Sequence, residues 1–160
     1  MSAEPVVVIG GGGHGKVVVS TLLAAGIRVP CVLDDDETKW GLEILGVPIR
    51  GPVSKAGEHG RLGILGIGDN LERERLAGTL GLEWTAVVHP RAWVHPSARL
   101  GAGTVVFAGA IVQPDTVIGR HVIVNTGALI DHDCEIGDYA HVAPGVKLSG
   151  GVRLGGGRRG

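Results

Sequence analysis

Residues 100–142 read LGAGTVVFAGAIVQPDTVIGRHVIVNTGALIDHDCEIGDYAHV, and every sixth residue, counted from the first, is a branched aliphatic. The spacing continues on both sides, so that twelve aliphatic residues stand six apart: Val88, Val94, Leu100, Val106, Val112, Ile118, Val124, Ile130, Ile136, Val142, Leu148 and Leu154. A period of six is neither the alternation of an ordinary strand nor the 3.6-residue period of a helix. It predicts a parallel β-helix, in which hexapeptides form short strands joined by turns.

A second period of eighteen residues lies on top of the first. Glycine follows the lead aliphatic at positions 101, 119, 137 and 155, so three hexapeptides make one coil of a triangular prism. The residue four places after each lead is small or slim in eleven of twelve cases, and the exception is Arg158. Because the repeat fails after residue 155 and solenoids normally cap their ends, we expect the prism, residues 88–160, to be truncated at its C-terminus. A truncated or frameshifted gene would put the activity of the chain in doubt.

Residues 1–87 lack this period and predict a small α/β subdomain of Rossmann-like type. Apolar runs predict buried parallel strands, and amphipathic segments predict helices between them. The predicted elements are strands at Val6–Ile9, Val29–Leu33 and Leu62–Ile67, helices at Lys16–Ala25 and Leu71–Leu80 with Asp69 or Asn70 as N-cap, and extended pieces at Val47–Ile49 and Trp84–Val88. Residues 36–60 otherwise predict surface loops. This order indicates a doubly wound sheet about half the size of a dinucleotide-binding domain.

Four consecutive glycines follow the first predicted strand and precede the first predicted helix. Their N–H groups and the positive end of the helix suit a phosphate, and an acidic group about twenty residues later suits a ribose or a base. We therefore predict a nucleotide-sugar site formed by Gly11, Gly12, Gly13, His14, Lys16, Asp34 and Asp35. A tight turn without ligand, with His14 as an exposed loop residue, is the alternative for this segment.

Composition limits the class of protein. The chain has 160 residues, 29 glycines and 3% aromatic residues, as a narrow prism with tight corners requires. A formal net charge of −1 argues against a nucleic-acid partner. No apolar run of eighteen residues and no signal peptide are found, so we predict a cytoplasmic protein without a membrane span. Cys31 and Cys134 are expected to be reduced thiols.

Two stretches carry a family resemblance: VIGGGGHGK at residues 8–16 and VNTGALIDHDCEIGDYAHVAPG at residues 124–145. They resemble the sialic acid O-acetyltransferase-like and nucleotide-sugar N-acetyltransferases of the left-handed β-helix superfamily. The resemblance covers nearly the whole chain, to about Gly155. It implies a left-handed prism, a homotrimer with active sites between neighbouring prisms, acetyl-CoA as co-substrate and no metal.

The resemblance also implies roles for individual residues. His132 matches the general base, and Asp133 or Asp131 matches the acid that orients its ring. His141 and Asn125 match residues that line the acetyl-CoA cleft. From the residues alone, a solvated histidine flanked by acids is the preferred interpretation of His132, and a corner hydrogen bond is an equally good account of Asn125.

These observations predict an acetyl-CoA-dependent N- or O-acetyltransferase that acts on a nucleotide-linked amino sugar or a sialic acid-like sugar. One alternative is a truncated, non-catalytic nucleotide-sugar-binding protein. Another is a zinc enzyme like the gamma-type carbonic anhydrases, which hold Zn²⁺ with three histidines between similar prisms. The sequence leaves the nucleotide, the sugar, the acetylated atom and the oligomeric state open.

Overall fold

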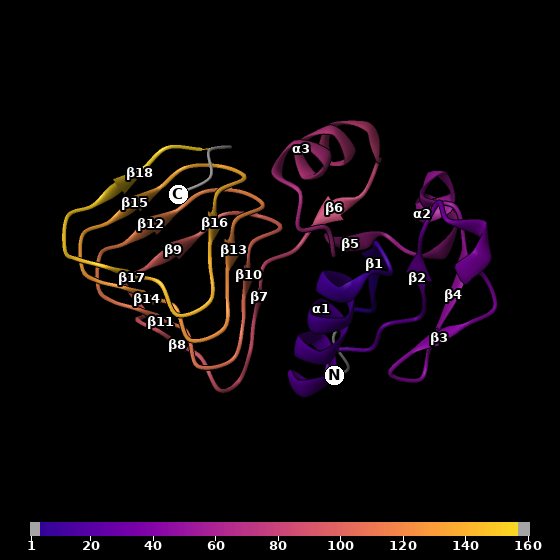
Figure 1. The fold of residues 1–160 in the computed structure, drawn as a ribbon, viewed down its shortest axis with the longest axis horizontal. Coiled ribbons are helices and arrows are strands. Elements are labelled where there is room, and N and C mark those ends of the chain that lie inside the picture. The colour runs from indigo at the N-terminus through magenta and orange to yellow at the C-terminus, as the bar shows by residue number, and fades with distance from the viewer. Residues whose placement is uncertain (1–3, 157–160) are drawn as a thin grey trace. The chain divides into compact units, whose positions relative to one another are not determined.

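The computed structural model describes residues 4–156 of the chain; residues 1–3 and 157–160, which include Arg158, lie outside the described residues. The chain divides into two compact units, residues 1–85 and residues 86–160 (Figure 1). No helix among the described residues is long and apolar enough to cross a membrane.

The first unit is built on a six-stranded sheet with the order β3-β4-β2-β1-β5-β6. All neighbours are parallel except β3 and β4, which are antiparallel. The strands are β1 Val6–Ile9, β2 Val32–Leu33, β3 Glu43–Ile44, β4 Val47–Gly51, β5 Leu62–Leu65 and β6 Glu83–Trp84. The helices are α1 Gly13–Ala24, α2 Ala56–His59 and α3 Asn70–Thr79, with 3-10 turns η1 Glu37–Lys39 and η2 Val53–Lys55. Strand β1 is buried along its whole length, as expected for a central parallel strand covered on both faces.

Several boundaries in this unit differ from those predicted. Helix α1 begins at Gly13 instead of Lys16, because Gly12 adopts an extended conformation as N-cap and the glycines after it enter the helix. Helix propensity disfavours glycine. At Gly15 close packing on Gly10 requires it, whereas Gly13 has open space around it. Residues 36–60, predicted as surface loops apart from one extended piece, contain η1, β3, β4, η2 and α2. For α3, the Asp69 side chain accepts the N–H of Glu72 at 2.8 Å, so one of the two predicted N-caps is confirmed.

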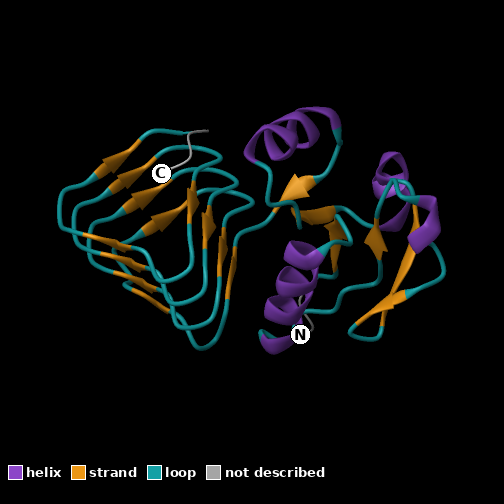
Figure 2. Ribbon diagram, in the orientation of Figure 1, coloured by secondary structure: helices purple, strands orange, loops and turns teal. Residues whose placement is uncertain are grey.

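The second unit is a three-sided coil of two-residue strands separated by turns (Figure 2). Its strands are β7 Val87–Val88, β8 Trp93–Val94, β9 Arg99–Leu100, β10 Val105–Val106, β11 Ile111–Val112, β12 Val117–Ile118, β13 Ile123–Val124, β14 Leu129–Ile130, β15 Glu135–Ile136, β16 His141–Val142, β17 Lys147–Leu148 and β18 Arg153–Leu154. They form three parallel sheets, with the orders β16-β13-β10-β7, β17-β14-β11-β8 and β18-β15-β12-β9. The predicted extended stretch from Trp84 to Val88 is therefore two strands, β6 and β7, in different sheets.

The two sequence periods have separate structural causes. The second residue of every strand is a lead aliphatic, and these residues pack with the small residues of the turns into one apolar interior. Glycine is needed at the corner because consecutive coils approach closely there. A β-carbon at position 101 would lie 2.4 Å from the carbonyl carbon of Gly119, one coil further on.

Candidate active site

The turn from Asp131 to Cys134 joins β14 to β15 and carries the histidine that was predicted to be catalytic. The side chain of Asp131 accepts the N–H of His132 at 2.8 Å. Asp133 has a φ of 57°, and its Oδ2 lies 2.7 Å from Nδ1 of His132. The two side chains are 60% and 62% exposed, so the pair lies on the surface of the coil.

The carboxylates around the ring change its protonation. The hydrogen bond to Asp133 and the charge of Asp131 raise the pKa of His132 above its ordinary value. In the neutral ring, Nδ1–H donates to Asp133, which leaves the lone pair on Nε2. An exposed imidazole held in this tautomer is suited to accept a proton from a nucleophile.

Gly150, one coil after His132, leaves room for the imidazole ring. A β-carbon at position 150 would lie 2.4 Å from Nε2 and 2.5 Å from Cε1 of His132. The neighbouring Gly151 donates its N–H to the carbonyl of His132 at 2.9 Å. The imidazole ring of His132 thus packs against Gly150 of the following coil, and its main chain is hydrogen-bonded to Gly151 of the same coil.

The structure brings together the two residues that were predicted to line the acetyl-CoA cleft. Nδ2 of Asn125 lies 3.0 Å from Nε2 of His141. Because Oδ1 of Asn125 accepts the N–H of Thr126 at 2.8 Å, Nδ2 is the donor and Nε2 of His141 the acceptor. His141 belongs to β16, in the sheet that contains β13, whereas His132 follows β14 of another sheet. Asn125 and His141 therefore form a polar pair on a different side of the coil from His132.

In the first unit, the glycine-rich turn combines close packing with open N–H groups. A β-carbon at position 15 would lie 2.1 Å from the carbonyl oxygen of Gly10, so only glycine fits there. At Gly12 and Gly13 a β-carbon would meet nothing within 4 Å. Helix α1 has no side-chain cap and no acidic residue in its first turn. Its N-terminus is therefore able to bind an anion.

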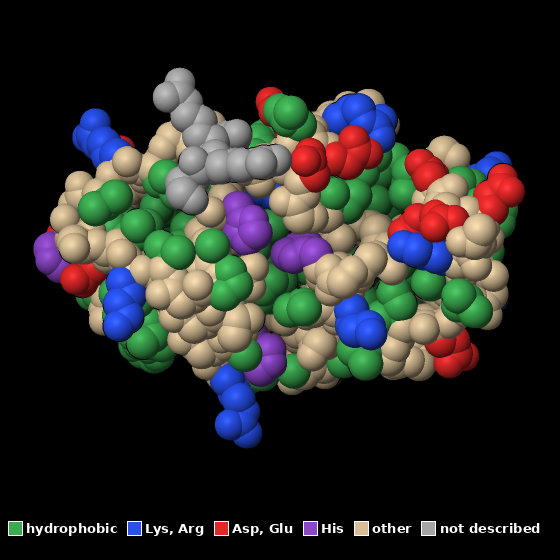
Figure 3. All heavy atoms as spheres, in the orientation of Figure 1, with side chains coloured by type: hydrophobic (Ala, Val, Ile, Leu, Met, Phe, Trp, Pro, Cys, Tyr) green, Lys and Arg blue, Asp and Glu red, His purple; other side chains and the backbone are tan. Residues whose placement is uncertain are grey.

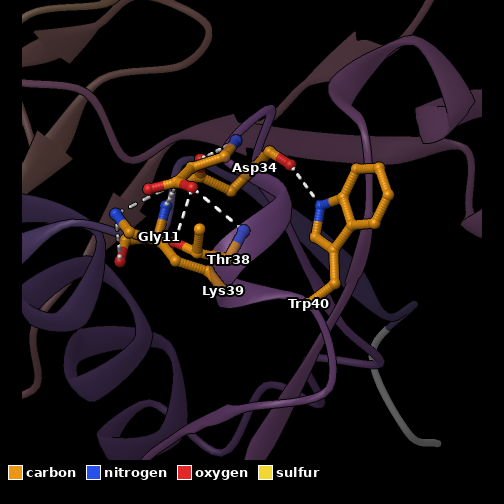
Figure 4. Close-up of polar contacts among 6 residues, drawn as sticks. Gly11, Asp34, Thr38, Lys39 and Trp40 are labelled. Carbon is orange, nitrogen blue, oxygen red and sulfur yellow. Dashed lines mark hydrogen bonds and ion pairs between the residues drawn. The ribbon is translucent and has the colours of Figure 1, made fainter.

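Asp34 holds the glycine-rich turn in place (Figure 4). Its Oδ2 accepts the N–H of Gly11 at 2.8 Å, and its Oδ1 accepts the N–H of Asp36 at 2.8 Å. Nζ of Lys39 lies 3.6 Å from Oδ2, and Nε1 of Trp40 donates to the Asp34 carbonyl at 2.8 Å. Asp34 thus lies at the predicted site, where its carboxylate is engaged by the protein's own N–H groups.

Lys39 is a candidate ligand-binding residue that the sequence reasoning missed. Its Nζ donates to the Gly11 carbonyl at 3.4 Å, and with Lys16 it lines a cavity of about 330 Å³ beside the glycine-rich turn. The cavity is lined by Gly11, Gly12, Gly13, Lys16, Lys39, Leu42, Glu43, Ile44 and Ile49. Two cations beside a helix N-terminus suit a phosphate group, and the apolar residues suit a base or a sugar. Lys39 lies five residues after Asp34, on a turn that was predicted as a loop, and this spacing matches no sequence motif.

The remaining predicted residues of this site lie apart from that cavity. Oδ1 of Asp35 accepts the N–H of Val53 at 3.0 Å, and Asp35 lines a second cavity of about 440 Å³ together with Arg75. His14 is the second residue of α1, and a β-carbon at Gly68 would lie 3.9 Å from its Cβ.

The loop beside His14 is held by the buried guanidinium of Arg73. Arg73 donates to the carbonyls of Ile67 at 3.3 Å and Gly68 at 3.0 Å. Burial lowers the pKa of Arg73 to about 10. The guanidinium therefore stays charged at neutral pH and keeps this loop in place next to α1.

Two further observations bear on the alternatives. Within residues 4–156, no group of three or more His, Cys, Asp or Glu side chains is placed to hold a metal ion, so this single chain lends no support to the zinc alternative. On the face drawn in Figure 3, the Lys and Arg side chains of the described residues lie apart and form no continuous basic patch. This fits the nearly neutral charge of the chain.

Known protein families match both units. Residues 5–80 match the PglD N-terminal domain, and residues 115–150 match the bacterial transferase hexapeptide (six repeats). A UDP-N-acetylbacillosamine N-acetyltransferase of Bacillus subtilis (strain 168) is 40% identical over 114 residues. That alignment covers 64% of this chain and 51% of the relative, so the matched region spans about half of the Bacillus protein.

Solved structures resemble the chain over nearly its whole length. A mutant of perosamine N-acetyltransferase from Caulobacter crescentus, in complex with CoA and GDP-perosamine, has a TM-score of 0.87 and 38% identity. The match covers 95% of this chain and 74% of that one. The acetyltransferase domain of PglB from Neisseria gonorrhoeae FA1090, in complex with acetyl coenzyme A, has a TM-score of 0.83 and 30% identity over 98% of this chain and 87% of its own.

These structural relatives are left-handed β-helix acetyltransferases, and they confirm the predicted fold class of an α/β unit followed by a left-handed parallel β-helix. The resemblance inferred from the glycine-rich turn and from residues 124–145 is confirmed as well. The chain belongs to the nucleotide-sugar N-acetyltransferases of the hexapeptide-repeat family.

Proposed function

We propose that the chain transfers the acetyl group of acetyl-CoA to the amino group of a nucleotide-linked amino sugar, with His132 as general base. The observation that carries this proposal is the 2.7 Å contact between Nδ1 of His132 and Asp133 on an exposed corner. The relatives are N-acetyltransferases of bacillosamine and perosamine nucleotides, which favours an amine over a hydroxyl as acceptor.

The proposed reaction is a direct transfer without an acyl-enzyme. The sugar amine attacks the thioester carbonyl while Nε2 of His132 removes the amine proton. The C–S bond breaks, and the thiolate of CoA takes up a proton as it leaves. Asp133 stabilises the imidazolium that forms, and main-chain N–H groups in the cleft stabilise the oxyanion.

We assign the two substrates to different parts of the chain. The glycine-rich turn, α1, Lys16 and Lys39 bind the diphosphate and nucleoside, and Asp34 positions the turn. Asn125 and His141 bind acetyl-CoA. Asp35 and His14 remain candidate contacts of the nucleotide sugar on the family resemblance. Cys31 and Cys134 are free and buried, which suits a reducing cytoplasm.

We further propose a homotrimer that brings His132 of one subunit to the Asn125–His141 pair of another. Within one chain His141 lies in β16 and Asn125 follows β13 of the same sheet, whereas His132 follows β14 of another sheet. One outer face of the coil carries Trp93, Ile111 and Leu129 in register on adjacent strands, and Trp93 is 54% exposed. Apolar side chains aligned across three coils favour burial against a second copy.

The role of His132 is tested by His132→Ala, assayed as thiol release from acetyl-CoA with a panel of amino-sugar nucleotides. We expect kcat to fall by about 10²–10⁴-fold, the usual worth of a general base, with KM nearly unchanged. The unfolding midpoint should stay at the wild-type value because the ring is exposed. Wild-type protein that binds nucleotide sugars but neither binds nor cleaves acetyl-CoA would favour the non-catalytic alternative instead.

The pH dependence follows from the raised pKa of His132. The base must be neutral, so kcat/KM should rise with pH through a pKa above the ordinary value of about 6.5 and then level off. Asp133→Asn removes the main cause of the shift, so the rising limb should move to lower pH and the plateau should fall. The matched control is Asp115→Asn, one coil earlier at the same corner and also in the left-handed region, with a φ of 61°. Equal profiles for wild type and Asp133→Asn would contradict the assignment.

Binding of the diphosphate is tested by titrating UDP, GDP and the free nucleosides into Lys39→Met. Loss of one charge-assisted hydrogen bond should weaken binding of the diphosphates by about tenfold or more and leave the nucleosides unaffected. Lys55→Met, an exposed lysine of the same unit that does not line the cavity, is the control. Equal weakening by both variants, or none by Lys39→Met, would refute a phosphate contact of Lys39.

The proposed trimer is tested by the mass in solution, measured by light scattering. Wild-type protein should have three times the mass of one chain, and Trp93→Glu should lower the mass by placing a charge in the contact. Val117→Glu, at a site 48% exposed on another face, should leave the trimer intact. A monomeric wild-type protein would contradict the proposed trimer. If only Val117→Glu dissociated the trimer, the subunit contact would have to be assigned to the face that carries Val117.

A further inference from the structure

The fourth residue after the lead aliphatic is a threonine in two hexapeptides only among the described repeats. In both, its hydroxyl bonds to a turn that carries a histidine. The residue four places after the lead aliphatic points into the coil, and among the described repeats it is Ala92, Ala98, Thr104, Ala110, Thr116, Val122, Ala128, Cys134, Ala140, Val146 or Val152. Threonine occurs at two of these eleven positions. Since alanine, valine or cysteine fills the others, winding the coil does not require a hydroxyl here.

The buried hydroxyl of Thr116 bonds to both ends of the turn that carries His132. Oγ1 donates to the carbonyl of Asp131 at 2.7 Å and accepts the N–H of Cys134 at 3.2 Å. Thr116 is fully buried, so water does not compete for these bonds. A single side chain thus spans the first and the last residue of the turn from inside the coil.

The neighbouring coils hold the middle of the same turn. Asp133 donates its N–H to the carbonyl of Pro114 at 3.1 Å, from the coil before. The carbonyl of His132 accepts the N–H of Gly151 from the coil after. The side chains of the turn's two central residues, His132 and Asp133, are exposed on this anchored backbone.

We propose that Thr116 is a positioning residue for His132, which holds the ends of the turn so that the imidazole stays against Asp133 and over Gly150. This proposal rests on the proposed role of His132 as general base. Thr116 itself touches no substrate. Thr116 acts through the backbone of residues 131–134, which sets the position of the His132 side chain. A small displacement of a general base lowers the rate of catalysis strongly.

Thr104 is a matched control supplied by the same fold. Its Oγ1 donates to the carbonyl of Gly119 at 2.7 Å and accepts the N–H of Val122 at 3.1 Å, so it spans the turn 119–122 in the same way. That turn carries His121, which is buried and stacks on Tyr139 at a ring distance of 5.4 Å. The two threonines make the same hydrogen bonds, but only Thr116 supports the proposed base.

The experiment compares Thr116→Val with Thr104→Val, since both changes keep the shape and remove the hydroxyl. Both should lower the unfolding midpoint, because each leaves a buried N–H without its partner: Val122 in Thr104→Val and Cys134 in Thr116→Val. The carbonyl of Gly119 still accepts the N–H of Gly101 in Thr104→Val, so the two stability losses need not be equal. Only Thr116→Val should lower kcat, by about tenfold to a hundredfold. It should also move the NMR titration midpoint of His132 downward, because a loosened turn weakens the contact of the ring with Asp133.

Two further variants keep the test decisive if Thr116→Val folds poorly. Thr116→Ala places at this position the residue that the coil already uses at Ala110 and Ala128, and it should show the same losses. Thr116→Ser restores the hydroxyl and should restore both kcat and the titration midpoint. Equal effects of Thr116→Val and Thr104→Val on kcat and on the His132 titration would overturn the proposal, as would wild-type values in Thr116→Val or Thr116→Ala. The proposed function would survive that result, because it is tested separately by the activity of His132→Ala.

Discussion

The register of eighteen residues between hydrogen-bonded coils is the constraint on which the second unit depends. Each inner strand pairs in parallel with the strands eighteen residues before and after it, so its side chains have fixed neighbours in the coils on both sides. The imidazole of His132 lies over Gly150, and the ring of His121 stacks on that of Tyr139. A shift of one residue would place aliphatic side chains outside and charged ones in the apolar interior. The geometry of the candidate base therefore follows from the same pairing that winds the coil.

Much of this architecture could be predicted because the contacts that build the coil repeat at fixed intervals along the sequence. The spacing of six marks the lead aliphatics that fill the interior, and the spacing of eighteen marks glycines where consecutive coils touch. In the first unit the apolar run from Val6 to Ile9 predicts a buried strand, which the structure has as β1. Helix α1 begins earlier than predicted, at Gly13, and contains Gly15, which packs so closely on Gly10 that only glycine fits; a propensity scale does not contain this contact.

The polar contacts could be predicted only where a motif or a family resemblance existed. Asp34 was found by its distance from the glycine-rich turn, but its bonds to the N–H groups of Gly11 and Asp36 depend on the path of the chain after β2. Lys39 reaches the cavity from η1, a turn without a sequence pattern. Thr116 looked like one more slim interior residue. Its importance appears only when the coil places it beneath residues 131–134, fifteen to eighteen positions later.

The two acidic neighbours of His132 balance two requirements of a base. The hydrogen bond to Asp133 and the charges of both carboxylates raise the pKa of the ring, which makes Nε2 a stronger base but reduces the neutral fraction at a given pH. Exposure limits this effect, because water screens the carboxylates on the surface of the coil. A ring on an exposed corner would otherwise sample many rotamers, so its direction has to come from the contact with Asp133 and from the space over Gly150. An exposed imidazole thus acquires a defined orientation from the coil beneath it while remaining open to a substrate on the outside.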